Sequence, residues 1–172
     1  LIDGLLVVCP LAVRKSWQRE VNVHVHEAVG AVAHCLQTGR KKAFSGFISG
    51  GAKLPILLVG AESLSAGGAM EMAREFVLSR RNVMIVADEG HMFKSHSATR
   101  SLNLTQLGSA CAFRLIMTGT PIANSPLDLF GQFEFLDPDI IGAGSWWAFR
   151  SRYAVMGGFE SRQVVGFRAI PE

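Results

Sequence analysis

The sequence has few of the features that define secreted and membrane proteins. It contains only three cysteines, Cys9, Cys35 and Cys111, an odd number spread far apart, so a disulfide framework is not expected and the thiols should be reduced. No apolar run reaches the ~20 residues that a membrane-spanning helix needs, and the first residues do not resemble a secretory signal. We therefore expect a protein of the cytoplasm or the nucleus that is neither secreted nor bound to a membrane.

Charged residues are also scarce. They make up 18% of the chain, below the usual quarter, and the formal net charge is only +3. This charge permits contact with a polyanion such as nucleic acid without requiring it, because net charge affects association rather than fold. What the chain has in quantity is apolar residues, 49% of its 172 positions, which is enough for the core of one domain.

The clearest signal of function is an apolar run at residues 83–87 that ends in Asp-Glu-Gly-His at residues 88–91. A short run of this kind, rich in β-branched residues, is typical of a strand buried on both faces in a parallel sheet. Ligands of such sheets bind just beyond the carboxyl ends of the strands. Adjacent carboxylates repel each other there unless a cation or a proton-transfer role compensates, so we expect Asp88 to hold a hydrated Mg²⁺ and Glu89 to orient or deprotonate a water. The four residues alone also fit an acidic turn without chemistry.

A second apolar run, residues 113–117, ends in Thr-Gly-Thr-Pro at residues 118–121. Together, V-M-I-V-A-D-E-G-H and R-L-I-M-T-G-T-P-I-A-N-S-P-L-D-L-F resemble motifs two and three of the superfamily-two helicases, in the Swi/Snf-type branch of double-stranded DNA translocases. The resemblance implies an α/β fold of the RecA-like, P-loop NTPase type, with a mostly parallel sheet flanked by helices in three layers.

The same resemblance implies ATP and Mg²⁺ as ligands and double-stranded DNA as a partner. It implies that Asp88, Glu89 and His91 are catalytic, with Asp88 holding the metal through water. The residues that it implies for coupling the nucleotide site to the DNA are Thr118, Gly119 and Thr120.

Two earlier segments resemble DNA-contacting motifs of this family. An apolar run at residues 5–9 predicts a strand that ends at Pro10. Its V-V-C-P-L, followed by a helix through Trp17 and Glu20, is similar to motif Ia, which implies that Pro10, Arg14 and Lys15 meet the DNA backbone. The two basic residues equally fit a solvated helix face.

The predicted strand at residues 55–59 leads into a loop similar to motif Ib, with Ser63 as its phosphate contact. Lys94 matches a lysine that the family has after the acid motif, and we expect it to bind nucleic acid, whereas Ser95 departs from the asparagine that follows there.

Residues 21–53 give weaker signals. The alternation of Val21, Val23 and Val25 predicts a short strand, and the spacing over residues 27–36 predicts a helix. Residues 39–53, rich in Gly, Ser and Lys, predict a flexible surface loop. This loop is not a P-loop, because no serine or threonine follows its lysine.

His24, His26, His34 and Cys35 form a metal-like cluster in the sequence, but no paired ligands follow downstream, so a zinc site is the less favoured interpretation. Helical spacing predicts three further helices, at residues 69–79, 97–107 and 126–135. We expect residues 1–138 to form part of a helicase ATP-binding lobe. Residues 139–172, an insertion or the start of an inter-lobe region, should pack their aromatic residues rather than stack them on bases.

The sequence contains neither a P-loop lysine motif nor a second lobe. We therefore expect a fragment, truncated at its amino end, of an ATP-dependent DNA translocase whose P-loop and second lobe belong to the same parent chain. By itself the chain should neither hydrolyse ATP nor bind it tightly. Two other functions stay open: a non-catalytic α/β module that binds nucleic acid or protein, and a translocase subunit of a restriction system.

Overall fold

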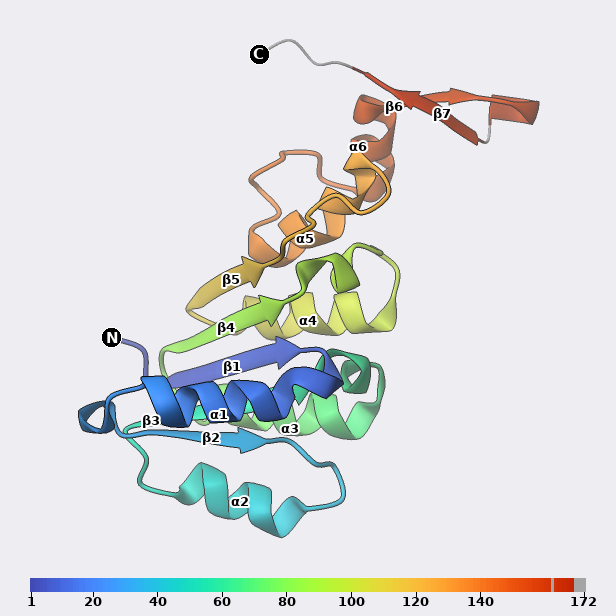
Figure 1. Cartoon of the computed structure of the whole chain (residues 1–172). Helices are drawn as coiled ribbons and strands as arrows, with labels where there is room; N and C mark the ends of the chain where they lie inside the picture. Colours follow the sequence, from blue (N-terminus) through green and yellow to red (C-terminus); the bar gives the residue numbers. More distant parts are fainter. Residues whose placement is uncertain (162, 169–172) are drawn as a thin grey trace.

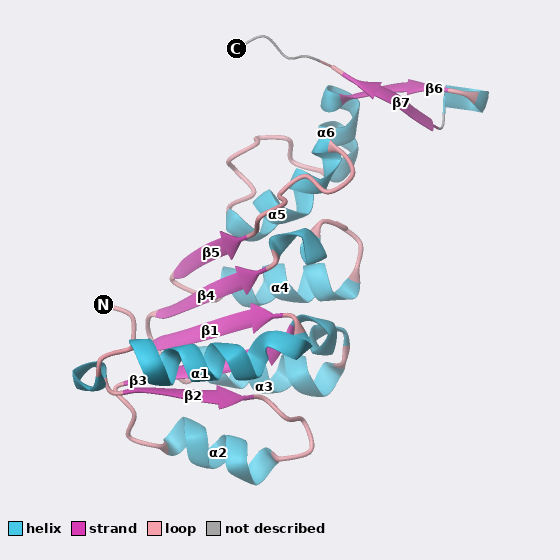
Figure 2. Ribbon diagram, viewed as in Figure 1, coloured by secondary structure: helices cyan, strands magenta, loops and turns pink. Residues whose placement is uncertain are grey.

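Five parallel strands form the sheet of the computed structural model, which describes residues 1–161 and 163–168 (Figure 1). The arrows of these strands all point in the same direction in Figure 2. The four strands expected from apolar runs are confirmed, and the sheet contains a fifth. In the spatial order of the sheet the strands are β2 (Ala31–Cys35), β3 (Leu54–Gly60), β1 (Gly4–Cys9), β4 (Val83–Asp88) and β5 (Phe113–Met117).

One face of the sheet is covered by four helices. Alternate strand residues such as Leu6, Val8 and Ile85, all fully buried, point into this side and meet Phe76 and Phe135 from the helices. This is the larger of the cores. The helices that build it are α2 (Lys41–Ser49), α3 (Gly67–Leu78), α4 (Thr99–Ser109) and α5 (Leu129–Leu136).

On the opposite face, α1 (Arg14–His24) packs Trp17 and Val21 against strand residues that include Val7 and Leu58. Figure 1 shows α1 in front of the sheet and α3 behind it. Helices therefore lie on both faces of a parallel sheet, which confirms the expected three-layer α/β fold.

The expectations for residues 21–53 were wrong in three places. Val21 lies inside α1, because its burial on the sheet outweighs the strand preference of the valine alternation. A 3₁₀ turn, Glu27–Val29, and the strand β2 replace the helix expected over residues 27–36, because residues 31–35 pair with β3. A helix, α2, replaces the loop expected over residues 39–53, since Phe44 and its neighbours at helical spacing pack into the core despite the glycines.

The other helices agree with the sequence. α3 and α4 lie within about two residues of the predicted bounds, and α3 begins with Gly67 and Gly68, two residues before its predicted start. The helix expected over residues 126–135 forms as a short 3₁₀ turn, Pro126–Asp128, followed by α5. Within the described ranges, no helix has the length and apolarity that a bilayer crossing requires. The three cysteines are free, as expected.

The C-terminal segment adds α6 (Trp146–Tyr153) and an antiparallel hairpin of β6 (Ala154–Gly157) and β7 (Gln163–Phe167). Trp146 and Phe149 pack against Phe130 of α5, as expected for packing aromatics, whereas Trp147 is 70% exposed. Residues 162 and 169–172 of the predicted C-terminal segment lie outside the described residues. The boundary at residue 138 stays a prediction.

Candidate functional site

The two helicase-like motifs lie at the same edge of the sheet. β4 and β5 are parallel neighbours, and Asp88 is paired in register with Met117. The acid loop, residues 88–91, and the T-G-T-P loop, residues 118–121, therefore leave adjacent strands side by side. This is the arrangement that parallel strands require if both loops serve one ligand.

Both carboxylate oxygens of Asp88 have a hydrogen-bond donor. The indole Nε1–H of Trp17 donates to Oδ2 at 2.8 Å, and the backbone N–H of Glu89 donates to Oδ1 at 3.0 Å. Asp88 itself is half-buried. The orientation of this carboxylate is therefore set by α1 on one side and by its own loop on the other.

Glu89 has a strained backbone. Its φ of 56° and ψ of 55° lie in the left-handed region, which costs a residue other than glycine roughly 1–2 kcal/mol. The next residue has to be glycine, because a Cβ on Gly90 would lie 2.5 Å from Cγ2 of Ile116. Such strain persists only where the surroundings hold it, and it concentrates at functional loops.

His91 and Glu89, both predicted to be catalytic, are in contact. Nδ1 of His91 lies 3.1 Å from Oε2 of Glu89. This is ion-pair distance without hydrogen-bond alignment, since Nδ1 is buried and makes no hydrogen bond to any described residue. The structure thus brings the acid pair and His91 together in one turn.

Asp128 and Gln132 contact the T-G-T-P loop and the segments that follow the two loops, and sequence reasoning did not find them. Oδ2 of Asp128 accepts hydrogen bonds from the backbone N–H groups of residues 123–125 and lies 3.7 Å from Nζ of Lys94. The buried Gln132 donates from Nε2 to the carbonyl oxygen of Pro121 at 2.6 Å. The sequence Ser-Pro-Leu-Asp, which ends at Asp128, is a helix-capping pattern and could have indicated that this carboxylate binds backbone N–H groups.

The T-G-T-P loop is otherwise held by one local bond. The backbone N–H of Thr120 donates to Oγ1 of Thr118 at 3.2 Å. Gly119 and Thr120 are exposed, and space is open around Gly119. Two of the three predicted coupling residues therefore form an exposed surface beside the acid loop, and Thr118 lies half-buried beneath them.

Arg14 and Ser63, predicted from separate motifs, line one cavity of about 260 Å³ together with Thr38 and Gly39. Arg14 is anchored there, because its Nη1 donates to the carbonyl oxygen of Leu36 at 2.6 Å. Thr38 was not singled out in the sequence, since its loop belongs to the region whose elements were misassigned. The cavity lies at the carboxyl ends of β2 and β3.

Pro10 and Lys15 do not line this cavity. Pro10 lines a second hollow of about 380 Å³, which also includes Trp17, Asp88 and Glu89. Lys15 is exposed on the first turn of α1. Of the residues expected to meet DNA, Arg14 and Ser63 are brought together, Pro10 lies with the acid pair, and Lys94 contacts Asp128.

The alternative metal cluster does not assemble. His24 pairs with Glu20 at 3.0 Å, and His34 stacks on Phe47, where burial lowers the pKa of its imidazole. Within residues 1–161 and 163–168, no three His, Cys, Asp or Glu side chains are grouped as a metal site would require. The carboxylate of Asp88 still fits Mg²⁺, which keeps several of its waters and binds through one or two carboxylates.

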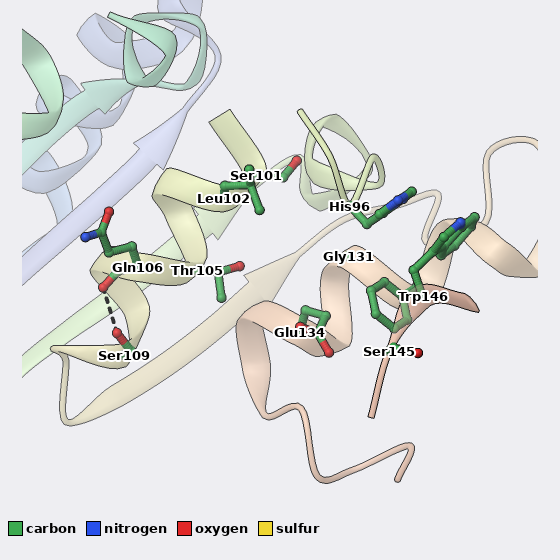
Figure 3. A pocket seen from close by; sticks show the side chains of 11 residues that line it. His96, Ser101, Leu102, Thr105, Gln106, Ser109, Gly131, Glu134, Ser145 and Trp146 are labelled. Atoms are coloured by element: carbon green, nitrogen blue, oxygen red, sulfur yellow. Dashed lines mark hydrogen bonds between the residues drawn. The ribbon is translucent and has the colours of Figure 1, made fainter. Parts of the chain in front are cut away.

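A larger cavity, about 450 Å³, lies between α4 and α5 (Figure 3). The ring of His96 stacks on Trp146 at its rim with a centroid distance of 4.3 Å, and burial lowers the pKa of this histidine. Glu134 is the one acidic residue in the lining. None of the predicted site residues lines this cavity.

Comparison with known proteins gives consistent matches. A family model described as the SNF2-related domain matches residues 2–158. The chain is similar to the DNA repair and recombination protein RDH54 of Saccharomyces cerevisiae, with 28% identity over 160 residues, 90% of this chain and 16% of that protein. It is also similar to the DNA annealing helicase and endonuclease ZRANB3 of Bos taurus, with 30% identity over 150 residues, 87% of this chain and 13% of that protein.

The fold matches a solved structure, the SWI2/SNF2 ATPase core of Sulfolobus solfataricus in complex with double-stranded DNA. The TM-score is 0.66 at 24% identity, over 88% of this chain and 28% of that one. The chain therefore spans only a small part of the length of the proteins that it matches.

Proposed function

The chain belongs to the SNF2-related domain family, and on that premise we propose that it is part of an enzyme that hydrolyses ATP to move along duplex DNA. The observation that carries the proposal is the parallel pairing of β4 and β5, which places the acid loop beside the T-G-T-P loop. The names of the relatives refer to DNA repair, recombination and annealing. Nothing in the described residues favours the non-catalytic module or the restriction subunit.

On the nucleotide side, we assign three roles to the acid loop. Asp88 would hold a hydrated Mg²⁺, Glu89 would orient or deprotonate the attacking water, and His91, 3.1 Å from Glu89, would support that carboxylate. Bound Mg²⁺ supplies positive charge that offsets the charge of the phosphates. The hydrogen bonds on both oxygens of Asp88 hold its carboxylate ready for that ligand.

The cradle for the phosphates comes from outside these 172 residues. The chain has no glycine-rich loop with a following Lys-Ser or Lys-Thr pair. In the segment at residues 39–53, which was compared with a P-loop, residues 41–49 form a helix. We therefore assign the P-loop, and a second lobe that completes the site, to other parts of a longer protein. The chain alone should not turn over ATP.

On the DNA side, Arg14, Lys15 and Ser63 contact phosphates of the backbone. Support comes from the cavity that Arg14 shares with Ser63 and from the exposure of Lys15 on the next position of α1. Pro10 shapes the turn into α1. Lys94 is a weaker contact, because binding DNA would compete with its interaction with Asp128.

Coupling runs through the T-G-T-P loop. Gly119 and Thr120 face solvent beside the acid loop, Thr118 is half-buried, and Gln132 holds the end of their loop through Pro121. Asp128 accepts a hydrogen bond from the backbone N–H of Asn124 and lies next to Lys94. A displacement of the T-G-T-P loop would therefore be transmitted through Asp128 to the segment around Lys94.

The hydrolytic role is tested by Glu89→Gln in a protein that contains this chain with a P-loop and a second lobe. We expect DNA-stimulated ATP hydrolysis to fall at least about 10²-fold while ATP binding is retained, because the variant keeps the shape but loses the base. Glu71→Gln, at an exposed position of α3, is the matched control. Normal turnover by Glu89→Gln would contradict the role.

The DNA role is tested on the chain itself. Binding to duplex DNA should be weak and independent of sequence, and its log affinity should fall with log salt by roughly 0.9 per phosphate contact. Lys15→Gln should reduce that slope by about one, whereas Arg74→Gln on α3 should leave it unchanged. Equal slopes for the two variants would show that Lys15 does not contact DNA and that the DNA-binding surface does not include this part of α1.

A further inference from the structure

In the described part of the chain, one hydrogen bond connects α1 to the acid loop. The indole of Trp17 donates to Oδ2 of Asp88 at 2.8 Å, although the two residues are 71 positions apart in the sequence. A hydrogen bond to an ionised acceptor is roughly twice as strong as one between neutral groups. The backbone N–H of Glu89 occupies the other oxygen, so the indole is the side-chain donor that limits rotation of the carboxylate.

α1 is a fixed support for this contact. Gln18 donates from Nε2 to the carbonyl oxygen of Ala33 at 2.9 Å, and Arg14 donates to the carbonyl oxygen of Leu36. Val21 is 8% exposed and packs in the core under the helix. The helix that carries the proposed phosphate contacts, Arg14 and Lys15, therefore also carries the donor to Asp88.

We propose that Trp17 is a positioning residue for Asp88 and that it links the DNA-contacting end of α1 to the metal-holding acid. The inference rests on the proposed function. Trp17 acts through Asp88 rather than on a reacting group. In a variant without the indole N–H, the carboxylate of Asp88 would rotate more freely, although an aromatic ring at position 17 could still pack between α1 and the sheet.

Trp17→Phe separates the two roles of the side chain, because phenylalanine keeps most of the ring and removes the donor. Trp147→Phe is the matched control, since Trp147 is 70% exposed. Thermal unfolding of both variants reports whether the fold is retained. Asp88→Ala removes the acceptor and gives a second approach to the same bond.

The first measurement uses the 172-residue chain and ¹⁵N-labelled indole groups. The Trp17 indole signal, assigned by its loss in Trp17→Phe, should exchange slowly with water and shift in Asp88→Ala. The Trp147 signal should exchange fast and not shift. A fast-exchanging Trp17 signal that is unchanged in Asp88→Ala would overturn the proposal.

The second measurement uses a protein in which the P-loop and the second lobe complete the site. Trp17→Phe should lower kcat roughly 10-fold and raise the Mg²⁺ concentration for half-maximal rate, with the KM for ATP unchanged. Wild-type rates for Trp17→Phe would overturn the positioning role. A wild-type protein without DNA-stimulated ATPase activity would instead contradict the proposed function, and the indole measurement would then decide the inference alone.

Discussion

The two faces of the sheet differ in how completely they are covered. On the face under α2, α3, α4 and α5, strand residues such as Leu6 and Ile85 are fully buried. On the other face, α1 covers β1, β2 and β3, whereas Phe113 and Leu115 of β5 are 52% and 40% exposed. The first face supplies most of the stability, and the second carries the contact from α1 to the acid loop.

β5 shows the difference within one strand. Arg114 and Ile116 point to the closed face, where Nε of Arg114 donates to the carbonyl oxygen of Gly108 at 2.8 Å. Their neighbours Phe113 and Leu115 point to the open face. Since side chains alternate along a strand, every second side chain of β5 contacts the helices on one face, while the side chains between them are exposed on the other face.

The largest effect on stability is expected from the closed face. Phe76 is fully buried at the centre of that core, so Phe76→Ala should lower the free energy of unfolding by about 3–5 kcal/mol. Urea unfolding followed by circular dichroism measures the loss. A loss below about 1 kcal/mol would show that this face does not dominate stability.

A smaller effect is expected from the open face. Phe113→Ser should change the free energy of unfolding by less than about 1 kcal/mol, because the side chain is already half in solvent. The same variant should reduce self-association of the chain, since an apolar edge strand favours pairing between molecules. Sedimentation velocity of the wild-type chain and of Phe113→Ser measures the self-association. If Phe113→Ser lowered the free energy of unfolding as much as Phe76→Ala does, the two faces would not differ in their contribution to stability.

The smallest effect is expected in the chemical reactivity of a thiol on the part of the second face that α1 covers. Burial, together with the charge of Asp88, raises the pKa of the Cys9 thiol to about 12 from 9.0. At pH 8 its thiolate fraction is therefore about 10³-fold below that of a free thiol, and the thiol should resist iodoacetamide. Mass spectrometry should find Cys35, which is only partly buried, modified first. Early modification of Cys9 would show that α1 opens readily.

The sequence predicted the strands and the residues of the acid loop well, because both depend on local patterns. Three of the five strands in the sheet, β1, β3 and β4, contain continuous apolar runs, and the run of β5 is interrupted only by Arg114. β2 was missed because its sequence, Ala31–Cys35, consists of small residues and a histidine around one valine, so no long apolar run marks it. α2 was missed because glycine and serine separate the three apolar residues that define its buried face.

The sequence alone determined the α/β class, the acid pair at the end of a buried strand and the resemblance of two linked motifs. Each of these lies within a run of residues whose spacing carries the information. Tertiary structure alone decided that Trp17 donates to Asp88, that Asp128 meets Lys94 and that one cavity holds both Arg14 and Ser63. Those contacts join residues distant in the chain, and they follow from the strand order and the packing of helices on the sheet, which no local pattern encodes.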